Sequence, residues 1–210
     1  MYDLEEQEKI DALKGWWHEN RATVLAVALV GVATYAGMSA WKAWKAHAAE
    51  QAAQAWTVFQ AAAVGGDAAT IAAAAQTIEA AAASSPFAAR AALSAASAQL
   101  AAGKPDAAQQ QYQWVIEHAK EAELQALARV RLAGVLADAK KYDEALHQLD
   151  SGIDPAFAAL AGDRKGDILL AQGKASEARS AYQQALQAAD GNHPLKPTLQ
   201  AKLDALGAGQ

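Results

Sequence analysis

A short turn-and-helix pattern recurs three times in the second half of the chain. It runs Gly-Lys-Pro-Asp-Ala-Ala from Gly103, Lys-Lys-Tyr-Asp-Glu-Ala from Lys140 and Gly-Lys-Ala-Ser-Glu-Ala from Gly173. The copies begin 37 and then 33 residues apart. A period of this length indicates a solenoid in which each copy is a pair of helices that buries its apolar face against the next pair.

Three sets of positions stay in phase with this pattern. Each copy has a small residue near the start of its second helix, a bulky residue one turn later, and another small residue in its first helix. The three sets are Ala108, Ala145 and Ala178; Tyr112, Leu149 and Tyr182; and Ala96, Ala133 and Gly166. Small residues let paired helices approach closely and the bulky residue fills the gap between them. This arrangement resembles the tetratricopeptide repeat, and a fourth, less clearly marked unit is expected over residues 56–83.

The composition supports an all-α fold. Alanine is the commonest residue, and it favours helix because it loses no side-chain entropy there. Runs of alternating β-branched or aromatic residues are absent after Trp56. Residues 42–64 contain no helix breaker, so one helix is expected to continue as far as Gly65 and Gly66. The last helix, over residues 194–206, has leucines on one face and is expected to cap the stack, with a docking helix for a partner as the alternative.

Residues 22–41 form an uncharged stretch between Arg21 and Lys42. Its twenty residues would rise about 30 Å as a helix, which is the thickness of the hydrocarbon core of a bilayer. Tryptophans favour the headgroup level, and the expected membrane-interface anchors are Trp16, Trp17, Trp41 and Trp44. A transmembrane helix is therefore predicted in preference to a cleaved signal peptide, because the segment before it is long and acidic. A buried core helix is also disfavoured, because the stretch is apolar on all sides.

The charges that flank the span bear on its orientation. Three basic residues precede the span, and two follow it closely. Cytoplasmic flanks carry the excess of Lys and Arg, so this small difference favours a cytoplasmic N-terminus. The predicted organisation is a cytoplasmic segment at 1–21, a transmembrane helix at 22–41 and an exported repeat domain at 42–210.

A stack of helix pairs presents a concave face made by its first helices, and this face is the predicted protein-binding groove. By repeat phase it would contain Arg90, Leu93, Ser97, Leu100, Leu127, Val130, Asp163, Asp167 and Leu170. The set is apolar with scattered charge, which suits an extended segment or an amphipathic helix of another protein. The alternative is that the leucines among these residues belong to the core.

The sequence contains no pattern typical of an enzyme. Its five histidines are widely separated, it has no cysteine, and its Gly-rich turns lack phosphate-loop spacing. Asp163 and Asp167 are four residues apart, but Arg164 and Lys165 lie between them, so a salt-bridged surface is expected. No metal, cofactor or catalytic residue is predicted. The net charge is −5, and no basic patch is visible, so nucleic acid is not an expected partner.

The segment Tyr2–Asn20 carries a pattern of the form E-E-Q…K-x-W-W-x-x-N directly before the span. With one span and tetratricopeptide-like repeats, it resembles the bacterial YfgM family, the ancillary subunits of the SecYEG translocon. Arg21 departs from the family pattern, in which a Gly is expected. The resemblance implies an inner-membrane protein with its N-terminus in the cytoplasm and its repeats in the periplasm. The implied partners are SecYEG, the membrane-anchored chaperone PpiD and exported polypeptides, together with a link to envelope stress signalling.

The sequence and the resemblance are therefore compatible with two functions. The first is a non-enzymatic, membrane-anchored scaffold or chaperone accessory at the translocon, which assists exported proteins as they emerge. The second is a negative regulator of an envelope stress response that acts through the acidic segment before the span. That segment, residues 1–21, has six acidic and three basic residues.

Overall fold

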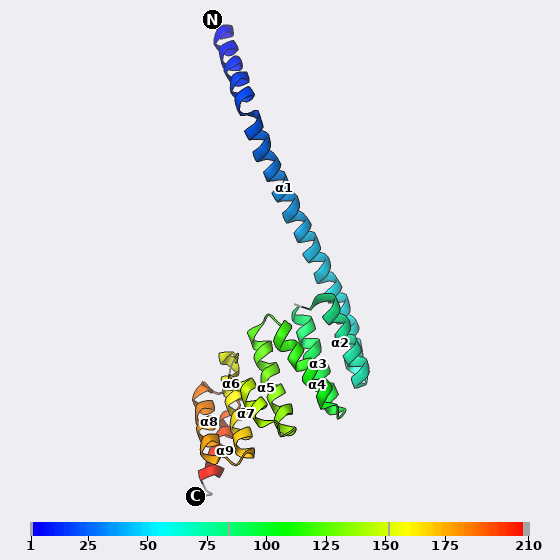
Figure 1. The fold of residues 1–210 in the computed structure, drawn as a ribbon, viewed down its shortest axis with the longest axis vertical. Coiled ribbons are helices and arrows are strands. Elements are labelled where there is room, and N and C mark those ends of the chain that lie inside the picture. The colour runs from blue at the N-terminus through cyan, green and yellow to red at the C-terminus, as the bar shows by residue number, and fades with distance from the viewer. Residues whose placement is uncertain (1, 84, 151, 208–210) are drawn as a thin grey trace. The chain divides into compact units, whose positions relative to one another are not determined.

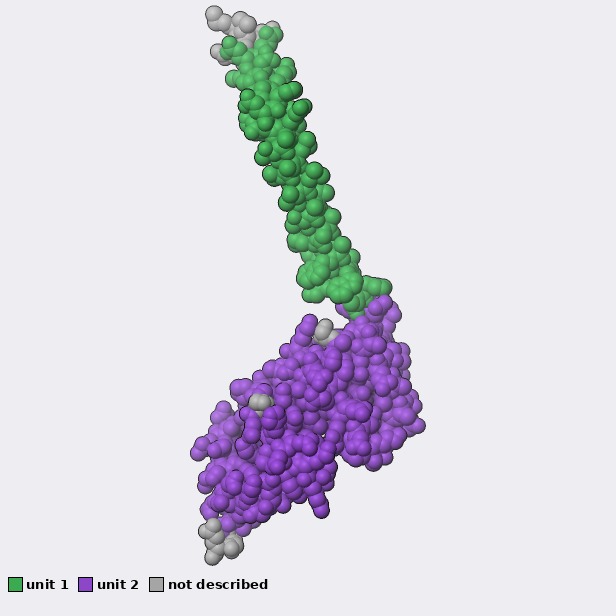
Figure 2. Space-filling view, in the orientation of Figure 1, with its two compact units in different colours: residues 1–48 green, residues 49–210 purple. Residues whose placement is uncertain are grey.

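The computed structural model describes residues 2–83, 85–150 and 152–207, with side chains described from Glu6 onward (Figure 1). The regular elements within these ranges are all α-helices or 3-10 helices, and no strand occurs in them. The prediction of an all-α fold is therefore confirmed. The chain divides into two compact units, residues 1–48 and 49–210 (Figure 2). Each unit is described by itself.

The first unit consists of one helix. Helix α1 begins at Tyr2 and ends at Gly65, with its last turns in the second unit. It contains the one stretch in the described residues that is long and apolar enough to cross a membrane, and none of that window is buried. Large apolar side chains such as Leu29 and Val30 are about two-thirds exposed within the unit. A helix of this kind needs an apolar environment outside the protein itself.

The second unit stacks its helices in chain order. The helices after α1 are α2 (Ala68–Ala82), α3 (Pro86–Ala101), α4 (Pro105–His118), α5 (Ala122–Asp138), α6 (Tyr142–Asp150), the 3-10 helix η1 (Pro155–Phe157), α7 (Ala158–Ala171), α8 (Ala175–Ala188) and α9 (Lys196–Gly207). Helices α3 and α4, α5 and α6, and α7 and α8 form the three predicted pairs. Each pair also packs on the pair that follows it, through the contacts of α4 with α5 and of α6 with α7.

The turn inside each pair has the same backbone geometry in all three copies. Gly103, Lys140 and Gly173 adopt positive φ angles of 70°, 62° and 77°. The following residue closes each helix with an N–H···O bond to a carbonyl five residues earlier, as in a Schellman motif. These bonds join Lys104 to Gln99, Lys141 to Leu136 and Lys174 to Leu169, at 2.8, 2.9 and 2.9 Å. The recurring sequence pattern therefore marks a recurring left-handed helix end.

The small and bulky repeat positions form the core, as predicted. The small residues Ala96, Ala108, Ala133, Ala145 and Ala178 are fully buried. The bulky residues are buried too, and they are Tyr112, Leu149 and Tyr182. Gly166 has no space for a β-carbon, because it would overlap the ring of Tyr182.

The fourth unit predicted over residues 56–83 is also present. Phe59 from the end of α1 is buried with Ile71 and Ile78 of α2, and all three share a core with α3. Trp56 stacks on Phe59 with ring centroids 5.2 Å apart. The last turns of α1 and the whole of helix α2 therefore form this unit through a shared core.

Helix α6 is shorter than the repeat pattern predicts. It ends at Asp150 after nine residues, whereas α4 and α8 each have 14. Gly152 follows at a φ of 71°, and a β-carbon there would lie 2.8 Å from Nε of Arg129. A left-handed turn packed against this arginine prevents the helix from continuing.

Helix α9 closes the end of the stack. It begins at Lys196, two residues later than predicted, and buries Leu199 and Leu203 against the core of α7 and α8. Leu195 and Leu206 pack at the edge of the same cluster. This contact agrees with the interpretation of a capping helix.

Candidate protein-binding site

The residues of the predicted concave groove fall into three groups. Leu93 and Val130 are buried in the core, 5% and 2% exposed, so the alternative of core residues holds for these two. Leu100 and Leu127 are half-buried against the same core. The remaining groove residues lie at the surface: Arg90, Ser97 and Leu170 are exposed, and Asp163 and Asp167 are partly exposed. The surface of this face is therefore more polar than the sequence predicts.

The two aspartates of the groove are held by a lysine from another helix. Nζ of Lys202 on α9 lies 2.6 Å from Oδ1 of Asp163 and 2.6 Å from Oδ1 of Asp167. Tyr182 donates its hydroxyl hydrogen to Oδ1 of Asp167 at 2.7 Å. The salt-bridged surface is confirmed, but the partner is not either of the intervening bases. Lys165 instead pairs with Asp150 at 2.7 Å.

This cluster shifts two titration equilibria. Burial of the ammonium lowers the pKa of Lys202, but the hydrogen bonds that it donates to Asp163 and Asp167 outweigh this effect, so the pKa is raised overall. Burial and the hydrogen bond to Asp167 raise the pKa of Tyr182 well above its usual range. Both shifts favour the protonated forms, which keep the hydrogen bonds that join α9 and α8 to the aspartates of α7.

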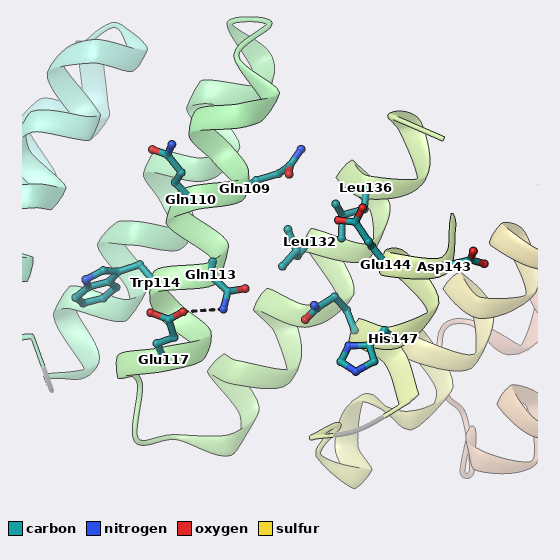
Figure 3. A pocket seen from close by; sticks show the side chains of 11 residues that line it. Gln109, Gln110, Gln113, Trp114, Glu117, Leu132, Leu136, Asp143, Glu144 and His147 are labelled. Atoms are coloured by element: carbon teal, nitrogen blue, oxygen red, sulfur yellow. Dashed lines mark hydrogen bonds between the residues drawn. The ribbon is translucent and has the colours of Figure 1, made fainter. Parts of the chain in front are cut away.

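A groove of the repeat unit lies on a different face, between the second helices of two neighbouring repeats. Helices α4 and α6 form its walls and α5 forms its floor, with a cavity volume of about 740 Å³ (Figure 3). We call it the α4–α6 groove. Its lining residues are Gln109, Gln110, Gln113, Trp114, Glu117, Leu132, Leu136, Asp143, Glu144, His147 and Gln148.

The α4–α6 groove combines an apolar floor with polar walls. Leu132 and Leu136 lie one turn apart on α5 and reach the space between the walls (Figure 3). Trp114 adds a half-buried indole on the α4 side, stacked on His118 with ring centroids 4.6 Å apart. Glu117 accepts a hydrogen bond from Gln113 at 2.8 Å. A concave, partly apolar surface with a few polar groups is the usual form of a binding site.

Sequence reasoning did not single out this groove. Its walls come from α4 and α6, where the exposed positions are ordinary surface residues of an amphipathic helix. The one available signal is Trp114, a large apolar residue directly after the polar run at 109–111 and 113. Tryptophan is enriched among the residues that contribute most to protein–protein binding, so a tryptophan among polar surface residues indicates a protein-binding surface.

The four tryptophans predicted as membrane-interface anchors all lie exposed on α1. Trp16, Trp17, Trp41 and Trp44 have exposed fractions between 44% and 68%. The ammonium of Lys45 lies 4.6 Å from the ring centroid of Trp41, a cation–π contact. Their placement at the membrane interface stays a prediction.

Within the described part of the chain, no cluster of three or more His, Asp or Glu side chains could hold a metal ion.

Comparisons with known proteins agree with the fold. A family model described as a tetratricopeptide repeat-like domain matches residues 14–208. A solved structure from work on Pseudomonas aeruginosa pilF superposes with a TM-score of 0.59 at 16% sequence identity, over 78% of this chain and 70% of that one. At this identity the likeness shows the fold alone.

A curated relative gives a closer sequence match. It is the ancillary SecYEG translocon subunit of Neisseria gonorrhoeae (strain ATCC 700825 / FA 1090), 41% identical over 105 residues. The match spans half of this chain and half of the relative's length. The resemblance to ancillary translocon subunits found in the sequence is thereby confirmed. Since the family model covers nearly the whole sequence, the chain belongs to the tetratricopeptide repeat-like domain family.

Proposed function

We propose that the chain is a non-catalytic, membrane-anchored protein-binding scaffold that associates with the SecYEG translocon. The observation that carries the proposal is the sequence match to an ancillary SecYEG translocon subunit. Two structural features support it: an exposed apolar helix of sufficient length to span a bilayer, and a stack of helix pairs with an open groove. Solenoids of this type present extended surfaces for other proteins.

In this proposal α1 anchors the chain in the bacterial inner membrane. Residues 1–21 lie in the cytoplasm, residues 22–41 span the membrane and residues 42–210 lie in the periplasm. The repeats would then stand where exported polypeptides emerge, beside a membrane-anchored chaperone of the PpiD type. The single candidate span among the described residues and the exposed tryptophans support this arrangement, and the orientation is the one that the family resemblance implies.

The test is co-purification of the full-length chain from bacterial membranes in a mild detergent. We expect SecYEG to be recovered with it at a constant ratio. A variant in which an unrelated apolar span replaces residues 22–41 separates recognition by the span from recognition by the repeats. Recovery of SecYEG no greater than with an unrelated single-span protein of equal abundance would contradict the proposal.

A second candidate is a regulator that binds a cytoplasmic signalling protein through residues 1–21. The acidic side chains of this segment favour it, because those described, from Glu6 onward, are exposed. Among them, Asp11 forms an ion pair, with its carboxylate 3.1 Å from Nζ of Lys14. Deletion of residues 2–14 distinguishes the two functions. The regulator loses signalling and keeps SecYEG, whereas the scaffold shows no change in signalling.

A further inference from the structure

We propose that the α4–α6 groove binds an extended, positively charged peptide segment, in which one or two large apolar side chains sit between Lys or Arg residues. This inference rests on the proposed protein-binding function and names the class of partner for one surface.

The charge of the groove is negative. Glu117 lies on the α4 wall, and Asp143 and Glu144 lie on the α6 wall, while no Lys or Arg lines the groove among the described residues. Lys141 approaches Glu144 only to 4.0 Å, with both side chains at least half exposed. The contacts of the other two acids are with neutral amides: Gln113 at 2.8 Å from Glu117, and Gln172 at 3.5 Å from Asp143. The carboxylates therefore attract a cationic partner.

The floor of the groove is apolar and firm. Leu132 and Leu136 are each 4% exposed and belong to the main core of the repeats. Their remaining surface faces the groove. A large apolar side chain placed here is removed from water without any rearrangement of the core. A purely polar or flexible cationic tail would leave this surface unused.

The amides on the walls favour an extended partner over a helical one. Gln109 and Gln110 project from α4, whereas the amide of Gln113 donates to Glu117 and that of Gln148 accepts a hydrogen bond from Arg129 at 3.3 Å. The amides of Gln109 and Gln110 make no hydrogen bond to any described part of the chain, and Figure 3 shows Gln109 extending from α4 into the space beside the floor. A side-chain amide offers one acceptor and two donors, which match the N–H and C=O of a peptide unit. An extended backbone has these groups free, whereas a helix has already paired them.

The experiment measures binding of a fluorescently labelled peptide to the full-length protein in detergent micelles, by anisotropy. The probe has about nine residues, enough to span about 30 Å when extended, with two leucines between two lysines in a Gly and Ser background. Two matched peptides serve as controls: one carries glutamates in place of the lysines, and the other carries serines in place of the leucines. We expect binding of the first peptide only, and weaker binding as salt rises from about 0.05 to about 0.5 M.

Two variants locate the binding. The triple variant Glu117→Gln, Asp143→Asn, Glu144→Gln removes the negative charge of the groove without touching the core. We expect it to weaken binding roughly tenfold. Its matched control is Glu123→Gln, Glu177→Gln, Asp190→Asn, which removes three exposed acids outside the groove and should bind as the native chain does. Gln113→Arg places a positive charge on the α4 wall and should also weaken binding.

The outcomes separate this inference from the proposed function. Equal binding of all three peptides, or equal loss in the groove variant and its control, overturns the groove as a specific site. If the groove variants lose the peptide and still co-purify SecYEG, the groove serves a partner other than the translocon and the inference holds. Absence of SecYEG with peptide binding intact contradicts the proposed function and leaves the groove established. Concentration-dependent self-association that the groove variants abolish, without peptide binding, assigns the groove to a second copy and overturns the inference.

Discussion

The ring of Tyr182 on α8 lies directly against Gly166 on α7, with no room for a β-carbon between them. Tyr182 is 1% exposed, and its hydroxyl donates to Asp167, the residue after Gly166. The third repeat therefore needs glycine at position 166 of its first helix, because the ring of Tyr182 from its second helix fills the space beside it. The same positions in the first repeat hold Ala96 and Tyr112, both buried.

Replacement of Gly166 by alanine should destabilise the repeats. Overpacking a filled core costs about 1–3 kcal/mol, which exceeds the gain of about 0.5–1 kcal/mol that alanine brings to a helix interior. The free energy of unfolding, measured by urea denaturation of the full-length protein in detergent, should fall. Gly134→Ala is the control, since its β-carbon would lie 3.6 Å from the nearest atom, Cζ of Arg164, an ordinary contact. Gly134→Ala should leave stability unchanged or slightly higher, and equal effects of the two changes would contradict this account.

Replacement of Lys140 by glycine should stabilise the second repeat. Lys140 has a φ of 62° at the helix end where the other two copies of the repeat have glycine. A left-handed conformation costs a residue with a side chain roughly 1 kcal/mol, and glycine removes that cost. The urea midpoint should rise, and Gly173→Ala at the equivalent turn should lower it. A lower midpoint for Lys140→Gly would show that the lysine side chain makes a stabilising contact that outweighs the strain.

The cluster around Lys202 should fasten α9 to the stack. Lys202→Met leaves Asp163 and Asp167 without their cation, and we expect a loss of about 1–3 kcal/mol in the free energy of unfolding. Limited proteolysis should then cut first within residues 189–207. Cleavage that starts in another helix would show that α9 is held by its leucines alone.

The same cluster predicts a loss of stability at alkaline pH. The pKa values of Lys202 and Tyr182 are raised above their ordinary values of 10.5 and 10.0, so the folded state holds these protons more tightly than the unfolded state. Their stabilisation is complete below the ordinary values and is lost as the pH rises through the folded-state values. The difference in stability between the native chain and Lys202→Met should therefore shrink above about pH 10. A difference that stays constant from neutral to alkaline pH would contradict the assignment.

The absence of cysteine allows the orientation of α1 to be tested directly. Single cysteines placed by Glu8→Cys and Gln187→Cys lie at exposed positions on either side of the predicted span. A maleimide that cannot cross the inner membrane should label Gln187→Cys in cells with a permeable outer membrane, and should label Glu8→Cys only after lysis. The reverse pattern would place the repeats in the cytoplasm.

The helix pairs are predictable from the sequence because their signals are local. Glycine or lysine at the turn, alanine five residues later and a bulky residue one turn further on depend on contacts within one pair. The length of α6 is not predictable in this way. The left-handed backbone of Gly152 follows the end of α6, and the repeat pattern does not mark this position.

The site is less predictable than the fold. Repeat phase assigned Leu93 and Val130 to an open face, but both are buried in the core. The partner of Asp163 and Asp167 lies 39 and 35 residues away on α9, although two bases stand between them in the sequence. The α4–α6 groove arises from the space left between helices of different repeats, and no single stretch of sequence encodes that space.

The two walls of the α4–α6 groove belong to different repeats, and its floor is α5, which pairs with α6 in one repeat and packs on α4 of the other. Its width therefore follows the angle between successive repeats. A side chain seated on Leu132 and Leu136 acts as a wedge that fixes this angle, and bending of the solenoid in turn narrows or widens the space available to it. Any force that changes the curvature of the stack would therefore change the affinity of this groove for its peptide.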